Sequence, residues 1–491
     1  MKISRIPILI FFLITFFLYF NIGKASINND AQFWYSRTNN FISAVIRRDW
    51  YETFQNPKPG VTVMWVSGLS LRIFLNLYEA VFHFRPNLFT YETFPYVHFS
   101  VIAPLVTIVL VSFVVFYYVL KKLFDSDVAL FSSILLFFQP IVIGLSRNFH
   151  SDAVTMAFML MSSFFAVYYF TYARKYKWLV ISGITAGLAL LSKSSAVFLI
   201  PYVGFVCLVD FLYVKTRPLD YIFSYIIWFT LLSFVFYALF PAMWVSFVPV
   251  LNWIFVEEGL TLVTTGRDGI NPFWYYIEPL FRILTPWFLI FLGVGIVSVF
   301  IFLKKESRVV QKRILMFLGF IFFYFIQMSL VKQKMDRYLL PILPFMGIIG
   351  GYGVSKLYKL VLKYRKHFVL LFLILNLSHV LYYFPNYLLY PSMFGKDQFG
   401  CSMCSNIGEY LNSQPNPSDL KIISLSNKLH RLQPFVKGKV YSTNEVLPNN
   451  WTPEFVVTSM QEQLPIQYSR CVLDTLIGFR GINYWKIYSC K

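Results

Sequence analysis

The stretch that decides the fold is KKESRVVQKRILMFLGFIFFYFIQMSLVKQKMDRYLLP, residues 304–341. A basic segment is followed by the uncharged run 314–331 and then by a second group of charges, Lys332, Lys334, Asp336 and Arg337. About 20 apolar residues are enough for a helix to cross the hydrocarbon core of a bilayer. The stretch therefore predicts a transmembrane helix with cations at both ends.

The composition of the whole chain indicates the same class. Its 491 residues are 57% hydrophobic and only 13% charged, and the mean hydropathy is +0.60. Soluble domains have about a quarter charged residues, so we expect an integral membrane protein. The net charge of +20 does not indicate a nucleic-acid partner, because the cations fall in short loops between apolar segments.

Eleven apolar segments are predicted to span the membrane, which makes the fold class an all-α polytopic membrane protein. The first segment is longer than the core of a signal peptide, so we expect an uncleaved anchor. The fifth is short and is separated from the sixth by Lys193, and the alternative for this pair is one re-entrant hairpin. The segments are 6–22, 97–120, 128–145, 154–171, 178–191, 196–213, 221–240, 283–303, 314–331, 338–355 and 368–384.

The distribution of Lys and Arg predicts the orientation in the cell membrane. With the N-terminus in the cytoplasm, every cytoplasmic segment is basic: 1–5, 121–127, 173–177, 214–220, 304–313 and 355–367. Positive residues favour the cytoplasmic side. The loops at about 23–96, 146–153 and 241–282 and the tail 386–491 are then extracytoplasmic.

Several charged residues fall on the outer side against this rule. The cations Lys58, Arg147, Lys193 and Arg337 are either side chains that reach the lipid headgroups or ligands of a fixed anion such as a lipid phosphate. The outer acids are Asp30, Asp49 and Asp152. Asp152 stands where the fourth span begins, so a helix cap is the alternative for it, and a solvated loop acid is the alternative for Asp30.

Acids and cations on one face predict glycosyl transfer from a polyprenyl-phosphate sugar. A carboxylate deprotonates the acceptor hydroxyl, and the cations stabilise the phosphate leaving group. Direct attack would invert the anomeric centre. The sequence does not determine whether the sugar is a mannose-like hexose or a pentose, nor whether the acceptor is a protein, a glycan or a lipid.

Nearly the whole chain resembles the membrane glycosyltransferases of the protein O-mannosyltransferase and aminoarabinose-transferase kind, glycosyltransferase family 39. The segments that carry this resemblance are the acid after the first span, NPKPGVTVMW (56–65), SRNFHSDAVTMAF (146–158), AGLALLSKSSAVFLIP (186–201), GINPFWYYIEPLFRILTP (269–286) and KMDRYLLPILP (334–344). The resemblance implies the GT-C fold, with extracytoplasmic loops and surface helices that form a cavity for donor lipid and acceptor.

The resemblance also implies roles for individual residues. Asp30 corresponds to the catalytic aspartate, although the family often has Asp-Glu where this chain has Asp30-Ala31. Asp152 corresponds to the acid of the second loop, and Asp49 is the reserve candidate. The expected substrate contacts are Arg37, Asp49, Lys58, Arg147, Lys193, Tyr275 and Arg337. Members of this kind generally need no metal, so no cofactor or metal is expected.

The tail differs from the rest of the chain. We expect domain 1–385 to be the membrane glycosyltransferase and 386–491 to be a small outer α/β domain, with strands at KIISLS, KVYST and FVVTS and a helix at CSNIGEYLNS. Four cysteines outside the membrane predict two disulfides with three possible pairings. A zinc site made of all four is the alternative. These residues are Cys401, Cys404, Cys471 and Cys490.

Two other readings of the sequence remain open. A transporter or flippase of lipid-linked sugars would also have many spans, but such proteins usually show repeats and ionisable residues near the middle of the membrane. The outer aromatic residues either stack on a sugar or form an interfacial belt. They are Trp34, Tyr35, Trp50, Trp65, Trp274 and Tyr275.

Overall fold

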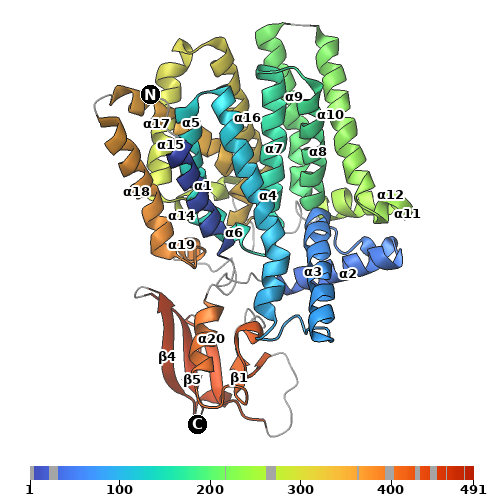
Figure 1. Ribbon diagram of the computed structural model, residues 1–491, viewed down its shortest axis with the longest axis vertical. Coiled ribbons are helices and arrows are strands. Elements are labelled where there is room, and N and C mark those ends of the chain that lie inside the picture. The colour runs from blue at the N-terminus through green and yellow to red at the C-terminus, as the bar shows by residue number, and fades with distance from the viewer. Residues whose placement is uncertain are drawn as a thin grey trace.

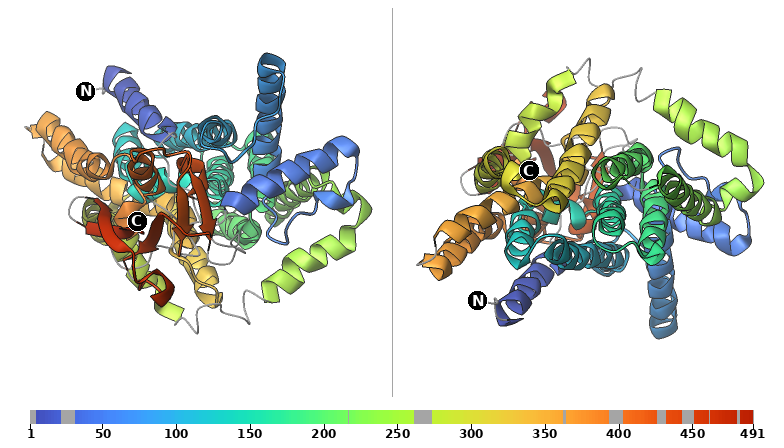
Figure 2. Two further views of the ribbon diagram at one scale, coloured as in Figure 1. Left: turned by 90° about the horizontal axis from the view of Figure 1, so that it is seen from below. Right: turned by 90° about the horizontal axis from the view of Figure 1, so that it is seen from above.

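The computed structural model describes residues 5–21, 31–215, 217–260, 273–361, 364–392, 403–425, 432–442, 451–460, 462–479 and 482–490. A bundle of helices forms most of the molecule, and a small domain with a β-sheet lies at one end of it (Figure 1). Views along the bundle show the sheet in front of the helices when seen from below and behind them when seen from above (Figure 2). The predicted fold class is confirmed.

All eleven predicted membrane segments are helical. Within the described residues, nine helices are long and apolar enough to cross a membrane, or ten if the bent pair α5 and α6 is one span. Helix α3 (Val61–Phe82) is one of these nine helices. Helix α8 and the described part of α1 are shorter apolar helices. The eleven segments correspond to α1 (Arg5–Phe20), α4 (Phe94–Leu123), α5 (Ser126–Phe137) with α6 (Pro140–Ser146), α7 (Asp152–Thr171), α8 (Tyr176–Ser192), α9 (Leu199–Val214), α10 (Pro218–Ala238), α15 (Pro286–Phe302), α16 (Arg308–Leu330), α17 (Leu343–Leu360) and α18 (Arg365–Tyr383).

The third predicted span is bent by 66° between α5 and α6. Pro140 is the first residue of α6. Proline has no backbone N–H to continue the hydrogen bonds of the preceding helix, and it is well suited to the first turn of a new one. The bend therefore follows from the local sequence. The chain then turns through residues 147–151 into α7, where the predicted acid Asp152 lies.

Helices α2 (Ala31–Arg47) and α3 (Val61–Phe82) lie at the end of the bundle next to the sheet domain (Figure 1). Gly60 precedes α3 with φ +63°, a conformation that favours glycine. A Cβ at this position would lie 2.3 Å from the Trp34 ring. The glycine thus lets the start of α3 pack against α2. The sequence analysis placed this segment in the loop 23–96, whereas the structure has a helix of 22 residues here that is long and apolar enough to cross a membrane.

Shorter helical elements complete the loops of this end. They are η1 (Tyr51–Thr53), η2 (Ser194–Phe198), α11 (Ala242–Val245), α12 (Phe247–Leu251), η3 (Asn252–Glu257), η4 (Phe273–Tyr276), α14 (Ile277–Ile283), η6 (Asp336–Ile342) and α19 (Leu389–Ser392), with η5 (Leu303–Lys305) at the opposite end.

The C-terminal part is a mixed sheet in the order β2-β1-β3-β5-β4, with α20 (Cys404–Asn412) packed beside it. The predicted strands are β1 (Lys421–Ser424), β2 (Lys439–Ser442) and β3 (Phe455–Ser459), and β1 pairs in parallel with both neighbours. The sequence analysis missed the antiparallel pair β4 (Val472–Phe479) and β5 (Ile482–Ser489). Further 3-10 turns are η8 (Gln433–Phe435) and η9 (Ile466–Tyr468).

Cys471 and Cys490 form a disulfide at the open end of the β4–β5 pair. Cys404 is also disulfide-bonded, and its partner lies outside the described residues. Cys207 is a buried free thiol in α9. A zinc site made of all four tail cysteines is therefore wrong, because at least three of these sulfurs are in disulfides.

Buried charges join four helices at the end of the bundle far from the sheet. The fully buried Asp210 of α9 accepts hydrogen bonds from Arg174 and Lys312, and from the Tyr221 hydroxyl at 2.8 Å. The next residue of α16, Arg313, donates to the Thr171 carbonyl at the end of α7 at 2.8 Å. A buried carboxylate needs such partners. The sequence analysis placed the important acids only in outer loops and overlooked this one.

The disulfides generate a thiol-counting prediction. Labelling of denatured, non-reduced protein should modify one cysteine, Cys207, and labelling after reduction should modify five. Breaking the Cys471–Cys490 bond, which closes a separation of 19 residues, should destabilise the C-terminal domain by about 2–5 kcal/mol. Four reactive tail thiols in protein kept oxidised throughout would contradict the assignment.

Candidate functional site

Asp152, the first residue of α7, lies at the centre of a buried cluster of charges. Its carboxylate is only 4% exposed and contacts side chains from three places in the chain. Lys193 Nζ is 2.5 Å from Oδ1, and Arg337 Nε and His150 Nδ1 lie 3.2 Å and 3.0 Å from Oδ2. The structure thus brings together three of the predicted residues, Asp152, Lys193 and Arg337.

The local conformation explains why these side chains meet. Lys193 ends α8 in an extended conformation, before η2 begins. Met335 has an extended conformation, and η6 begins at the next residue, Asp336. Arg337 is therefore the second residue of η6. Lys193 Nζ also lies 4.0 Å from the centre of the Tyr338 ring, an attractive geometry for a cation over an aromatic face. Each cation therefore stands at the start or end of a helix, where its side chain can turn into the loop region.

A second acid–base cluster adjoins the first through the backbone of η6. Arg282 Nη2 donates to both oxygens of Asp336, at 3.0 Å and 2.8 Å, and Nε donates to Oδ2 at 3.1 Å. The Tyr275 hydroxyl donates to Oδ1 at 3.1 Å. Asp336 is therefore held by an arginine that the sequence analysis did not single out. The only sequence feature that pointed to Arg282 was its position in the segment 269–286, which resembles the family and also contains Tyr275.

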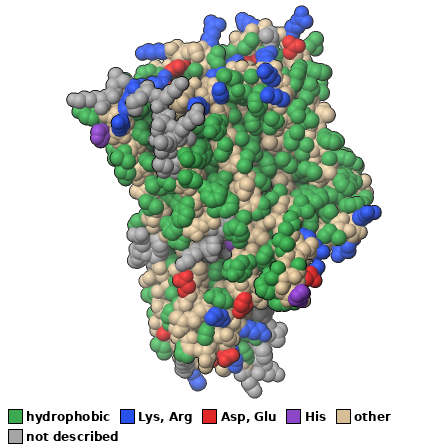
Figure 3. All heavy atoms as spheres, viewed as in Figure 1, with side chains coloured by type: hydrophobic (Ala, Val, Ile, Leu, Met, Phe, Trp, Pro, Cys, Tyr) green, Lys and Arg blue, Asp and Glu red, His purple; other side chains and the backbone are tan. Residues whose placement is uncertain are grey.

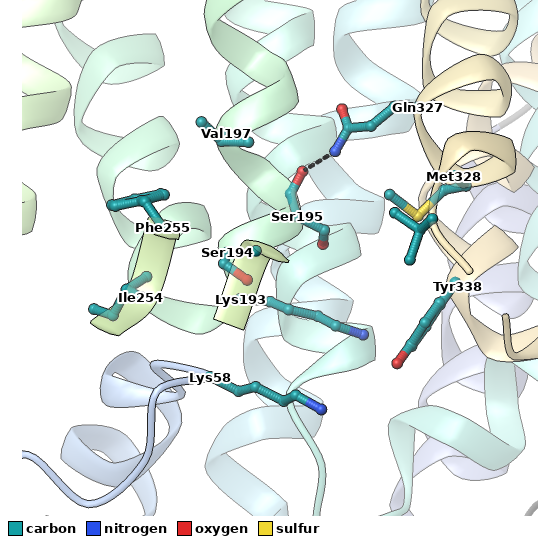
Figure 4. A pocket seen from close by; sticks show the side chains of 12 residues that line it. Lys58, Lys193, Ser194, Ser195, Val197, Ile254, Phe255, Gln327, Met328 and Tyr338 are labelled. Atoms are coloured by element: carbon teal, nitrogen blue, oxygen red, sulfur yellow. Dashed lines mark hydrogen bonds between the residues drawn. The ribbon is translucent and has the colours of Figure 1, made fainter. Parts of the chain in front are cut away.

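Lys58 and Lys193 line one cavity, shown in Figure 4. The cavity has a volume of about 290 Å³, and most of its wall is apolar. In this view the two lysine side chains extend in the same direction, toward Tyr338. Gln327 donates to the Ser195 carbonyl at 3.3 Å across the upper wall. The apolar lining residues are Val197, Ile254, Phe255, Met328 and Val331.

Lys58 has an acidic neighbour at the edge of this cavity. Its Nζ is 3.2 Å from Glu258 Oε1, with side-chain exposures of 43% for Lys58 and 13% for Glu258. The pair links the loop before α3 to the helix that follows η3. Lys58 is the more exposed member of the pair, and a partly exposed cation can exchange one anion for another. The ammonium group of Lys58 is thus available to another anion that enters the cavity.

Helix α2 packs against the Asp152 cluster at its N-terminal end. The Trp34 ring lies 5.6 Å from the His150 ring, and the Arg37 guanidinium lies over Phe33 and Trp34 at 5.7 Å and 5.9 Å. Asp30 directly precedes this helix in the sequence but lies outside the described residues.

The structure does not bring Asp49 into the same cluster. Asp49 is exposed and follows the other end of α2. At a rise of 1.5 Å per residue, it lies roughly 20 Å along the helix from Trp34.

Arg147 is buried and contacts backbone carbonyls, whereas Lys193 and Arg337 contact Asp152. Its guanidinium donates to the carbonyls of Asn21 and Pro385, the latter at 2.8 Å, and lies 5.1 Å from the Tyr387 ring centre. Burial lowers the pKa of Arg147 to about 10, so it stays charged at neutral pH. These contacts tie the end of α1 to the segment after α18. The substrate contact expected for Arg147 is not part of this arrangement.

Residues 88–244 match the family model for dolichyl-phosphate-mannose-protein mannosyltransferases. No curated protein sequence matches the chain significantly. Among solved structures, ArnT from Cupriavidus metallidurans bound to undecaprenyl phosphate is 13% identical with a TM-score of 0.56, and 99% of each chain is covered. The apo form of that ArnT gives 14% identity and a TM-score of 0.55, with 99% of this chain and 98% of ArnT covered.

A weaker match is the oligosaccharyltransferase AglB from Archaeoglobus fulgidus. It is 12% identical with a TM-score of 0.48, over 87% of this chain and 63% of AglB. The family model over residues 88–244 agrees with the resemblance that the sequence motifs indicate. The likeness to ArnT along nearly the whole chain shows that this multi-pass membrane protein has the predicted GT-C fold.

Proposed function

We propose that the chain is an inverting glycosyltransferase that moves a mannose-like hexose or a pentose from a polyprenyl-phosphate donor to an acceptor hydroxyl on the extracytoplasmic face. The observation that carries the proposal is the cavity of Lys58 and Lys193. The two lysines supply its cationic groups, and residues of α16, η2 and η3 form an apolar wall beside them. A lipid phosphate has the same division into an anionic head and an apolar chain.

The comparisons support a donor of this kind. ArnT, which shares the fold, was solved with undecaprenyl phosphate, and the matching family model is named for dolichyl-phosphate mannose. In this chain we assign the phosphate to Lys58, Lys193 and Arg337. A lysine contributes a compact charge, and an arginine adds two parallel donors.

The proposed reaction needs one proton acceptor and one set of cations. Asp30 takes the proton of the acceptor hydroxyl while the oxygen of that hydroxyl attacks the anomeric carbon. The bond from that carbon to the phosphate oxygen breaks, and the polyprenyl phosphate leaves with its charge stabilised by the cations. Asp152 keeps Lys193 and Arg337 at the phosphate. This scheme uses only side chains of the protein, and we expect no cofactor.

The membrane orientation is part of the proposal. Lys and Arg side chains gather at the end of the bundle opposite the C-terminal domain, beyond a belt of hydrophobic side chains (Figure 3). That end contains the loops with Lys121, Lys122, Lys304 and Lys305. Positive loops favour the cytoplasm. The Asp152 cluster, α2, α3 and the C-terminal domain are then extracytoplasmic.

The catalytic assignment is tested at Asp30. Asp30→Asn should reduce sugar transfer by about 10²–10⁴-fold, because an amide cannot accept the hydroxyl proton. Binding of undecaprenyl phosphate to the purified protein should stay within about twofold, since the cations remain. Asp49→Asn is the matched control and should keep wild-type turnover. An active Asp30→Asn together with an inactive Asp49→Asn would transfer the role to Asp49.

The donor site is tested by two changes of opposite sign. Lys58→Ala should weaken undecaprenyl-phosphate binding by about tenfold, because one charged contact is lost. Glu258→Gln should strengthen it by about two- to fivefold, because the phosphate no longer competes with a carboxylate for Lys58. Titration in detergent measures both. Equal affinities for wild type and both variants would remove Lys58 from the donor site.

The buried cluster is tested by a double-variant cycle. Asp152→Asn leaves Lys193 and Arg337 without their carboxylate and should destabilise the protein by about 3–5 kcal/mol. Asp152→Asn combined with Arg337→Gln should be less destabilised than the sum of the single variants. Arg337→Lys should restore only part of the donor affinity lost in Arg337→Ala. Strictly additive stability losses, measured by thermal unfolding in detergent, would show that the pair is not coupled.

A further inference from the structure

A cleft runs between the segment that leads into α4 and the C-terminal domain. It consists of two hollows of about 680 Å³ and 440 Å³, which share Tyr91, Glu92 and Lys437 in their walls. The larger hollow has the size of a small-molecule site, roughly 300–1,000 Å³. None of its lining residues lines the cavity of Lys58 and Lys193.

One ring contact joins the two parts of the chain, and further contacts within the C-terminal domain hold its side of the cleft in shape. The Phe94 ring at the start of α4 meets the Phe435 ring of η8 edge to face at 5.9 Å. The Asn412 side chain donates to the Phe435 carbonyl at 3.0 Å and accepts from the Lys437 backbone N–H at 2.9 Å. A Cβ on Gly408 would lie 2.3 Å from the Phe435 carbonyl oxygen. Helix α20 and the loop that follows η8 are therefore closely packed, and the floor of the cleft is preformed.

The walls combine exposed aromatic rings with charges of both signs. Tyr91 and Tyr96 are 37% and 64% exposed, and Lys437 Nζ lies 5.7 Å from the centre of the Tyr91 ring. Glu92 and Glu409 are exposed carboxylates in the same wall. Ring faces can pack against the C–H groups of a sugar, and carboxylates and amines can bind its hydroxyls or amino groups.

We propose that this cleft binds an oligosaccharide portion of the acceptor, neutral or amine-bearing, at a distance from the reacting hydroxyl. The inference rests on the proposed glycosyltransferase function and adds the chemical class of the acceptor. A polyanionic acceptor is disfavoured because Glu92 and Glu409 balance the charges of Lys437 and Lys439. An extended peptide is disfavoured because the wall presents rings and side-chain charges rather than a row of backbone groups.

The cleft is linked to the Asp152 cluster through α2. His98 lines the larger hollow, and its Nδ1 lies 2.6 Å from the Tyr35 hydroxyl. Burial raises the pKa of Tyr35 well above its usual value, so the hydroxyl keeps its proton. The Tyr35 ring meets Phe149 at 4.9 Å, and the next residue, His150, contacts Asp152. A continuous chain of contacts through His98, Tyr35 and the segment 149–150 thus connects the cleft with the charged site.

The test measures binding without donor and without turnover. The full chain in detergent is applied to an array of neutral, amine-bearing and sulfated oligosaccharides, with unglycosylated peptides included. We expect binding to neutral or amine-bearing oligosaccharides. Tyr96→Ala should weaken it by about tenfold, whereas Tyr96→Phe keeps the ring and should retain it. Thermal unfolding should be unchanged, because Tyr96 is exposed.

Two controls separate this inference from the proposed function. Tyr172→Ala removes a tyrosine of similar exposure, 51%, at the far end of α7 and should bind like wild type. Asp30→Asn should also bind oligosaccharides normally, although its sugar transfer is reduced by about 10²–10⁴-fold. The cleft assignment is overturned if no neutral or amine-bearing oligosaccharide binds, if peptides or sulfated chains bind instead, or if Tyr96→Ala has wild-type affinity. Those outcomes leave donor binding and transfer to be judged on their own assays.

Discussion

The buried carboxylate of Asp152 is the interaction on which the outer end of the bundle depends. A buried charge is strongly unfavourable unless it is paired and hydrogen-bonded, and here Lys193, Arg337 and His150 are its partners. These partners come from the end of α8, from η6 and from the loop before α7. The requirement to pair one acid thus brings together segments that are up to 185 residues apart, Asp152 and Arg337.

The same principle acts at the opposite end, where Asp210 pairs with Arg174 and Lys312. Between these two clusters the helices are apolar and pack through aromatic and aliphatic side chains. Apolar packing between helices has little directional preference, and inside a membrane it gains little from the hydrophobic effect. The paired charges therefore fix the contacts of the helices that they join, at the ends of α7 and α8 and in α9 and α16.

The outer end divides its functional groups between two hollows. The cavity of Lys58 and Lys193 has the cations and the apolar wall that suit a lipid phosphate. The cleft beside the C-terminal domain has exposed rings and mixed charges. Helix α2 lies between them, with Trp34 against His150 and Tyr35 against His98. In the proposed reaction, the donor phosphate and the acceptor sugar are thus bound in separate hollows.

The sequence by itself determined the class, the membrane segments and the strands β1 to β3, because apolar runs, basic loops and β-branched runs are local properties. It also selected Asp152, Lys193 and Arg337, because each charge stands out against an apolar background. Only the tertiary structure decided that these three meet, that Arg282 holds Asp336, and that Arg147 binds backbone carbonyls. It also decided the β4–β5 pair and its disulfide. Pairing between distant residues depends on how the helices and strands pack, and no local pattern records which buried charge will neutralise which.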